Sequence, residues 1–198
     1  INIGTIHTIA LDTDNNLWLG SGKGLIYLNV KQNVFERIKL EETYEWLNRA
    51  PVYTLLFSNR GELWIGTSYG LSVFSPEKNN FRHYSEKDGL ANSFVYAIEE
   101  DIQGNIWVST NHGLSKLNPL TGKFRNFTRN EGLQAYEFNK GASYASMDGE
   151  LFFGGVSGLN SFYPDEIYDN PISPEIAITK FQVISSSGKF DIPVGKYT

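Results

Sequence analysis

Short apolar runs separated by turn residues recur along the whole chain, which is typical of a β protein with many short strands. In the clearest stretch, these runs predict strands at about 52–58, 63–67, 71–74 and 81–84. Glycine, asparagine and proline fill the intervals between them, as expected of hairpin turns and loops. The first run is apolar at nearly every position rather than at alternate ones. We therefore expect neighbouring structure to cover the sheet on both faces.

This set of four strands is repeated along the sequence. An aromatic residue in the second strand and a Gly-Leu pair after the second turn recur about every 40–50 residues, a period typical of propeller blades. The aromatic residues are Trp18, Trp64, Trp107 and Phe152, and the glycines are Gly24, Gly70, Gly113 and Gly158. One aromatic residue per repeat at a fixed position indicates packing between blades rather than ligand binding. The sequence thus predicts an all-β chain, a β-propeller fragment of four blades built from four-stranded antiparallel sheets.

The repeats also predict the organisation of the chain. The blades lie at about 5–40, 50–85, 93–128 and 138–164, so that residues 1–164 form the propeller region. Each of the first three repeats ends in an outer strand with the pattern F-x-x-[YFI], and the fourth repeat lacks it. The last blade is therefore predicted to be incomplete. Residues 165–174 carry Asp, Asn and Pro in the manner of a linker.

Composition narrows the function classes. The formal net charge of −5 disfavours nucleic-acid binding, which rewards basic surfaces. No apolar run approaches the roughly 18 residues of a membrane span, and the first residues lack the pattern of a signal peptide. The absence of cysteine removes disulfides, thiolate nucleophiles and cysteine-ligated metals.

Turns, capping and solvation account for the candidate catalytic and metal-binding residues better than catalysis or metal binding does. Asp12, Asp14 and Asn16 have the spacing that opens a calcium loop, but they align with a hairpin turn of the other repeats. The histidines at 7, 83 and 112 are scattered. The carboxylates at 99–101 also fall at a turn of the repeat, where capping or solvation accounts for them. We therefore expect no catalytic residues, no metal site and no cofactor.

The repeat pattern as a set resembles a known family. The consensus V-x-x-I-x-x-D-x-x-G-x-[LI]-W-[IV]-G-T-x-x-G-L, followed by F-x-x-[YF] and D-G-L, is similar to the two-component regulator propeller repeat. Asp88-Gly89-Leu90 and Glu131-Gly132-Leu133 match its closing element, and residues 138–164 resemble the terminal blade of that family. The stretch 174–183 looks like the first strand of the Ig-like triple-tyrosine domain that follows such propellers. The resemblance assigns residues 175–198 to the start of that domain.

Membership would imply a role. Such propellers form the periplasmic sensor of hybrid histidine kinases in Bacteroidetes-like bacteria, and these receptors commonly respond to oligosaccharides. The chain carries no kinase, receiver or DNA-binding segment, and it holds four blades where the family usually has more. The resemblance therefore implies that the kinase and the remaining blades are partners outside this sequence.

A ligand would meet loops rather than strands. The second turn of each blade and the connection between blades are predicted to emerge on one face. The candidate ligand-binding residues on that face are Tyr44, Trp46, Arg49, Tyr69, Asn92, His112, Tyr136 and Asn139. Trp46 lies outside the repeat position of the other tryptophans, and an aromatic ring beside an arginine suits stacking on a sugar. The alternative is that Tyr44 and Trp46 only cap the ring of blades.

Three function classes remain. A sensor that binds an oligosaccharide or similar polar ligand is favoured, because the loop face is aromatic and rich in amides with few acids. A propeller lyase or glycosidase would show converging carboxylates or a histidine pair, and a WD-type scaffold would show that family's His and Asp signature. Because the fourth repeat lacks its outer strand, we also expect this chain to self-associate as a dimer or to exchange its tail, 174–198, with a partner.

Overall fold

The computed structural model describes all residues except 1–3, 38–41, 169–180, 186–187 and 193–198. Contacts divide the chain into two units, Ile1–Glu166 and Ile167–Thr198. The second unit contains one antiparallel hairpin, formed by β16 (Phe181–Ser185) and β17 (Gly188–Ile192). Most of the stretch 174–183 lies outside the described residues, so its assignment to an Ig-like domain stays a prediction.

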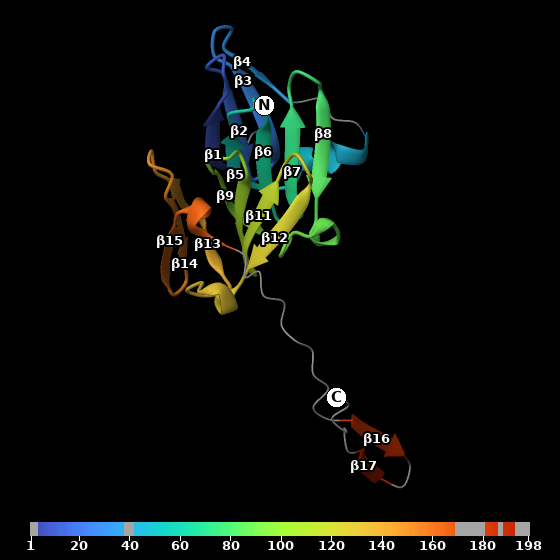
Figure 1. The fold of residues 1–198 in the computed structure, drawn as a ribbon. Helices are drawn as coiled ribbons and strands as arrows, with labels where there is room; N and C mark the ends of the chain where they lie inside the picture. Colours follow the sequence, from blue (N-terminus) through green and yellow to red (C-terminus); the bar gives the residue numbers. More distant parts are fainter. Residues whose placement is uncertain (1–3, 38–41, 169–180, 186–187, 193–198) are drawn as a thin grey trace. The chain divides into compact units, whose positions relative to one another are not determined.

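The first unit consists of antiparallel sheets that each follow the chain order (Figure 1). Blade 1 contains β1 (Ile6–Leu11), β2 (Leu17–Ser21), β3 (Gly24–Asn29) and β4 (Val34–Glu36). Blade 2 contains β5 (Val52–Phe57), β6 (Leu63–Thr67), β7 (Leu71–Ser75) and β8 (Asn80–Tyr84). Blade 3 contains β9 (Val95–Glu100), β10 (Ile106–Thr110), β11 (Gly113–Asn118) and β12 (Lys123–Phe127). Blade 4 contains only β13 (Phe138–Ala145), β14 (Leu151–Gly155) and β15 (Gly158–Phe162).

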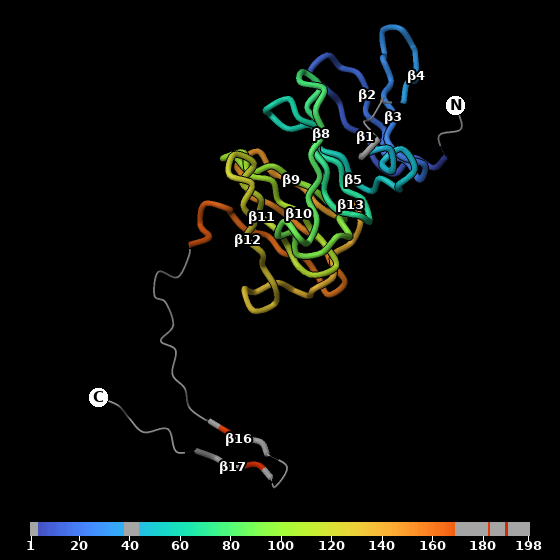
Figure 2. The backbone as a smooth tube through the Cα atoms, turned by 90° about the vertical axis from the view of Figure 1, so that its right-hand side faces the viewer, coloured from blue at the N-terminus to red at the C-terminus, as the bar shows by residue number. Residues whose placement is uncertain are grey.

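The first strands of the blades pack on one another in order, β1 on β5, β5 on β9 and β9 on β13. Figure 2 shows the same succession of blades in a view turned by a right angle. The all-β propeller fold predicted from the sequence is therefore confirmed, including the fourth blade that lacks an outer strand.

The repeated aromatic residues lie between blades. Trp18, Trp64 and Trp107 are 3%, 1% and 0% exposed. Trp18 contacts Phe74 of blade 2 with 5.6 Å between ring centroids, and Trp107 contacts Phe162 of blade 4 at 4.8 Å. Phe152 occupies the same register position but is half-buried, and among the described residues no further blade packs on it. The packing role that the repeat predicts is thus visible wherever a following blade is present.

Blade 3 shows why the repeat carries an aspartate six residues before its tryptophan. Asp101 is 3% exposed, and its Oδ2 accepts a hydrogen bond of 2.8 Å from the indole Nε1 of Trp107. The same carboxylate accepts from the backbone N and side-chain Nδ2 of Asn105. Lys116 Nζ lies 3.7 Å from it. One buried acid therefore caps the first turn and satisfies the buried indole.

The indoles of the other two repeat tryptophans lack the hydrogen bond that Trp107 makes. In the described part of the chain, Nε1 of Trp18 and Nε1 of Trp64 are buried without a hydrogen-bond partner. In blade 2, the aspartate position is taken by Ser58, whose hydroxyl accepts only from the backbone N of Glu62. Among the three tryptophans of the repeat, Trp107 is therefore the one whose indole N–H is paired, although Ser109 Oγ of the same blade is buried without a partner among the described residues.

The D-G-L turn that closes blade 2 and the E-G-L turn that closes blade 3 are each held by hydrogen bonds, and we call such a turn a latch. Ser85 donates through its N and Oγ to Asp88 Oδ2, at 2.8 and 2.9 Å, which lowers the pKa of that carboxyl. The carbonyl of the following Gly89 then accepts from Asn126 Nδ2 of blade 3 at 2.9 Å. The next connection repeats these bonds, with Thr128 and Glu131 in the turn. Each D-G-L or E-G-L turn thus fixes its own blade to the next one.

We predict that Asp101→Ala lowers the free energy of unfolding by about 2–4 kcal/mol, because it leaves the indole of Trp107 and the charge of Lys116 without their partner. Ser58→Ala is the matched control in blade 2, and its expected loss is at most about 1 kcal/mol. Urea denaturation of the two variants measures the difference. Equal losses would contradict the role given to the Asp101–Trp107 bond.

Candidate functional site

The connection between blades 1 and 2 departs from the latch of the other connections. In place of a three-residue turn it carries a longer 3-10 helix, η1 (Glu42–Asn48). Leu47 is 1% exposed and anchors this helix in the core. At Gly24, with φ of 106°, a Cβ atom would lie 2.4 Å from the carbonyl oxygen of Asn48. The repeat glycine of blade 1 therefore allows the end of η1 to rest against the second turn.

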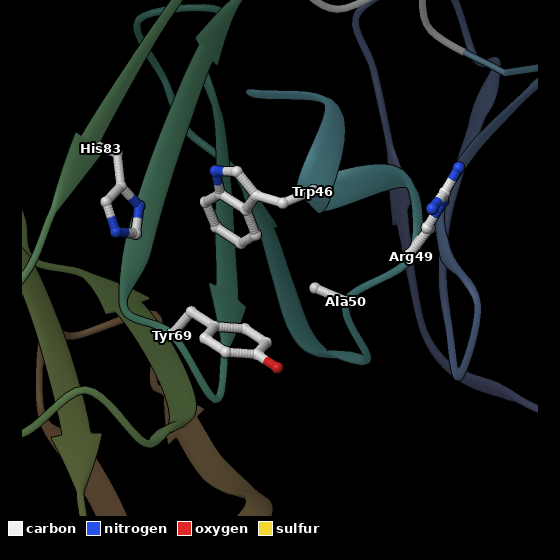
Figure 3. Close-up of a pocket in the computed structure, with 5 residues that line it drawn as sticks. All are labelled: Trp46, Arg49, Ala50, Tyr69 and His83. Atoms are coloured by element: carbon white, nitrogen blue, oxygen red, sulfur yellow. The ribbon is translucent and has the colours of Figure 1, made fainter. Parts of the chain in front are cut away.

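The helix η1 places Trp46 over blade 2. The indole lies 5.7 Å from the ring of Tyr69 and 5.0 Å from that of His83, both in edge-on geometry. These three rings, together with Arg49 and Ala50, line an open cavity of about 550 Å³, called here the aromatic pocket. Figure 3 shows Trp46 between His83 and Ala50, with Arg49 standing apart from the rings. The volume is within the range of small-molecule sites, about 300–1,000 Å³.

His83 is held neutral inside this pocket. Its Nδ1 lies 3.0 Å from Ser72 Oγ, and the ring also makes a hydrogen bond with the backbone of Tyr69. Burial lowers the pKa of His83 below its usual value near 6.5, while that backbone bond and the charge of Asp88 oppose the shift. At neutral pH the pocket thus presents three uncharged rings and one arginine. Among the described residues that line it, none is a carboxylate.

The structure brings three of the sequence-predicted residues together and assigns a packing role to a fourth. Trp46, Arg49 and Tyr69 line the aromatic pocket. Trp46 is half-buried, whereas Tyr69 is 60% exposed. The ring of Tyr44 lies 5.8 Å from that of Phe81 and packs on the core of blades 1 and 2. Trp46 packs against the same core, so the capping alternative stays open for both residues, and Trp46 differs from Tyr44 in also lining the aromatic pocket.

The remaining candidates lie elsewhere on the described surface. His112 and Tyr136 stack with 4.8 Å between ring centroids, which pairs the second turn of blade 3 with the next connection. Asn92 donates to Glu86 Oε1 at 3.3 Å, and its Oδ1 accepts from the backbone N of Phe94 at 3.0 Å. Asn139 is exposed on β13. None of the four lines the aromatic pocket.

Two features were missed in the sequence. His83 is one of three scattered histidines in the sequence and was not among the candidate residues, yet it forms one wall of the pocket. The second residue of each first strand also lies at one register position, and there His7 stacks on Tyr53 at 6.0 Å. Lys140 Nζ lies 3.9 Å from the centre of the same Tyr53 ring. The repeated I-H, V-Y and V-Y pairs were the signal for this second cluster.

The acidic residues of the described ranges serve turns rather than a metal site. Asp12 Oδ1 accepts from the backbone N of Asp14 at 3.0 Å and of Asn16 at 2.8 Å, so it caps a turn as the repeat alignment predicts. Within those ranges, no three His, Asp or Glu side chains gather in the manner of a metal site. No helix in the described part of the chain has the length and apolar character needed to cross a bilayer.

The family model described as Two component regulator propeller matches residues 89–112. The matched stretch runs from the end of the latch of blade 2 through the first two strands of blade 3.

The relatives that match most of the chain are a histidine kinase and two putative hybrid two component systems. The chain is 27% identical over 194 residues to Histidine kinase P4 of Formosa agariphila, covering 96% of this chain and 14% of that protein. The extracellular domain of the putative hybrid two component system BT3049 from B. thetaiotaomicron matches with a TM-score of 0.79 and 28% identity, covering 96% of this chain and 26% of that one. For BT4673 from the same organism the TM-score is 0.68 at 25% identity, with coverages of 81% and 23%. The chain therefore spans about a quarter or less of these relatives.

An enzyme shares the fold. Virginiamycin B lyase from Staphylococcus aureus matches with a TM-score of 0.59 at 18% identity, covering 98% of this chain and 72% of that one. At this identity the likeness concerns the arrangement of blades alone.

We predict that the His83 ring titrates below pH 6.5 in the folded chain. Because the unfolded state binds that proton more strongly, this contribution to stability is complete above about pH 6.5 and is lost as the pH falls toward the folded pKa. Proton NMR of the His83 ring measures the titration. A pKa at or above 6.5 would contradict the buried, neutral histidine of the aromatic pocket.

Proposed function

We propose that this chain, which belongs to the two-component regulator propeller family, forms part of the extracellular ligand-sensing region of a hybrid two-component receptor. The extracellular domains of BT3049 and BT4673, which it resembles along most of its length, support this location. We propose that the chain lies on the periplasmic side of the inner membrane, as in receptors of the Bacteroidetes type. The kinase that receives the signal and the remaining blades belong to the rest of the receptor.

The ligand we propose is an oligosaccharide bound in the aromatic pocket. The observation that carries this proposal is the departure of the first connection from the repeat, because η1 replaces a latch and sets Trp46 beside Tyr69 and His83. A sugar ring offers apolar C–H faces to aromatic rings and hydroxyls to an arginine, so the pocket suits it on both counts. Connections that vary while the blades stay constant are where binding sites are expected.

The segment is proposed to bind rather than to catalyse. Acid–base catalysis of glycoside cleavage needs a pair of positioned titratable groups, most often two carboxylates. The described lining of the aromatic pocket offers the imidazole of His83, whose pKa is lowered by burial, and the guanidinium of Arg49, but no carboxylate. An arrangement of this kind favours recognition.

We predict that Tyr69→Ala and Trp46→Ala each weaken oligosaccharide binding by about tenfold, because each removes a ring that a sugar would stack on. The probe is the tightest ligand from an array of neutral and acidic oligosaccharides, measured by calorimetry. Tyr144→Ala is the matched control, because Tyr144 is 62% exposed, like Tyr69, but lies outside the pocket. Unchanged binding in both pocket variants would overturn the proposed site.

We further propose that other blades cover the two outer faces of this fragment in the intact receptor. Ile9 is 59% exposed, whereas Leu55 and Ile98 at the same register position are 8% and 3% exposed. Leu159 of blade 4 is 60% exposed, but its counterpart Leu71 in blade 2 is fully buried. Positions that are core in the middle blades are thus open on the outer two, and that apolar surface favours association.

The isolated chain is therefore predicted to dimerise, with blade 4 of each copy on blade 1 of the other. Light scattering after size exclusion should give twice the mass of one chain at micromolar concentration. Ile9→Lys and Leu159→Lys should each shift the protein to monomer, because a charge would then be buried at the contact. A parent chain that stays monomeric would refute this mode of association.

A further inference from the structure

A second cavity adjoins the aromatic pocket and has the opposite chemical character. It has a volume of about 360 Å³ and is lined by Lys23, Arg37, Asn48 and Arg49. Lys23 lies in the second turn of blade 1, Arg37 directly follows β4, and Asn48 and Arg49 lie at the end of η1. We call this cavity the cationic pocket. Because Arg49 lines both cavities, one ligand can reach both.

The Arg37 guanidinium is fixed in this cavity. Its Nη1 donates to the backbone carbonyl of Lys23 at 3.1 Å and to that of Asn48 at 2.9 Å. These two bonds tie the second turn of blade 1 to the end of η1. The side chain is thereby oriented in advance, and its remaining N–H groups make no other hydrogen bond to the described residues.

The charges of this cavity are not balanced in the described part of the chain. None of its three cations forms an ion pair with a described carboxylate. Three like charges around one cavity repel one another, and an anion placed among them relieves that repulsion. Arginine is suited to the flat, two-oxygen face of carboxylates and related oxyanions.

Asn48 adds a second and independent requirement. Its side-chain Oδ1 is buried and has no hydrogen-bond partner among the described residues. A buried acceptor without a partner costs stability, and a ligand hydroxyl that donates to it would remove that cost. A ligand of this cavity therefore needs an anionic group and a nearby hydroxyl.

We propose that the cationic pocket binds the anionic substituent of an acidic sugar, either a carboxylate or a sulfate ester. The proposal rests on the proposed oligosaccharide-binding function and narrows its ligand class. The charged group lies among Lys23, Arg37 and Arg49, and a hydroxyl donates to Asn48. An adjoining ring of the same oligosaccharide lies against Trp46 in the aromatic pocket. The receptor thereby selects charged glycans over neutral ones.

The test is an NMR titration of the ¹⁵N-labelled chain at constant ionic strength. The probes are methyl glucuronide for a carboxylate, glucose 6-sulfate for a sulfate ester, sodium sulfate for the bare anion, and methyl glucoside as the uncharged control. We expect saturable shifts of the Arg37 Nε–H and Asn48 amide signals with at least one of the charged sugars. We expect none with methyl glucoside or with added chloride.

Matched variants locate the effect. Lys23→Gln is expected to weaken binding of the charged sugar about tenfold, and Arg37→Gln by at least as much. Lys31→Gln makes the same change of charge at the other edge of blade 1, in the turn between β3 and β4, and should leave binding unchanged. If Arg37→Gln disturbs the fold, Lys23→Gln still tests whether the cationic pocket binds the anion. The Lys23 side chain makes no described hydrogen bond that holds the turn, so its replacement should leave the fold intact.

The outcomes separate this proposal from the one on which it rests. Saturable binding of the glucuronide or the sulfate ester, lost in Lys23→Gln, supports the proposal and names the anionic group. Equal binding of methyl glucoside, binding of sodium sulfate alone, or no saturable binding of any anion overturns it. A neutral oligosaccharide that needs Trp46 but is indifferent to Lys23→Gln would leave the aromatic pocket intact and refute only the acidic ligand.

Discussion

Each middle blade of this chain is apolar on both faces and is stable only when another blade covers each face. This constraint accounts for the repeat, because Trp18 and Trp107 fill the space between their own blade and the next. It also accounts for the exposure of Ile9 and Leu159 at positions that are buried in the middle of the fragment. Burial of apolar surface at about 25 cal/mol per Å² makes such contacts the dominant stabilising term.

Between blades, the chain uses two kinds of connection. The latches after blades 2 and 3 hold a capped turn with a glycine carbonyl that accepts from an asparagine of the next blade. The connection after blade 1 gives up that arrangement and inserts η1, which contacts the second turns of blades 1 and 2 through Asn48 and Trp46. The blades thus form the scaffold, and the connection that contains η1 contributes the residues of the two proposed binding pockets. Its rings face blade 2, and its cations face blade 1.

Much of the fold could be predicted from the sequence because the sequence repeats with each blade. The strand positions of blade 2, the four aromatic positions and the missing outer strand follow from the presence or absence of residues that recur at one register position in each blade. The site was predicted only in part. Trp46, Arg49 and Tyr69 stood out because they lie in the predicted loops of one face, and Trp46 also falls outside the repeat position. His83 lies in a regular strand and enters the pocket only through the fold of η1. Lys23 and Arg37 were missed since their proximity depends on two backbone carbonyls that no sequence pattern marks.

The central claim is that the departure from the repeat creates the ligand site. Replacing residues 37–51 by residues 85–94 would exchange the exceptional connection for the latch that joins blades 2 and 3. The binding of an array-selected oligosaccharide, measured by calorimetry together with the circular dichroism of the chimaera, tests this directly. The account predicts β structure like that of the parent and complete loss of binding. A folded chimaera that binds the oligosaccharide as tightly as the parent would contradict it.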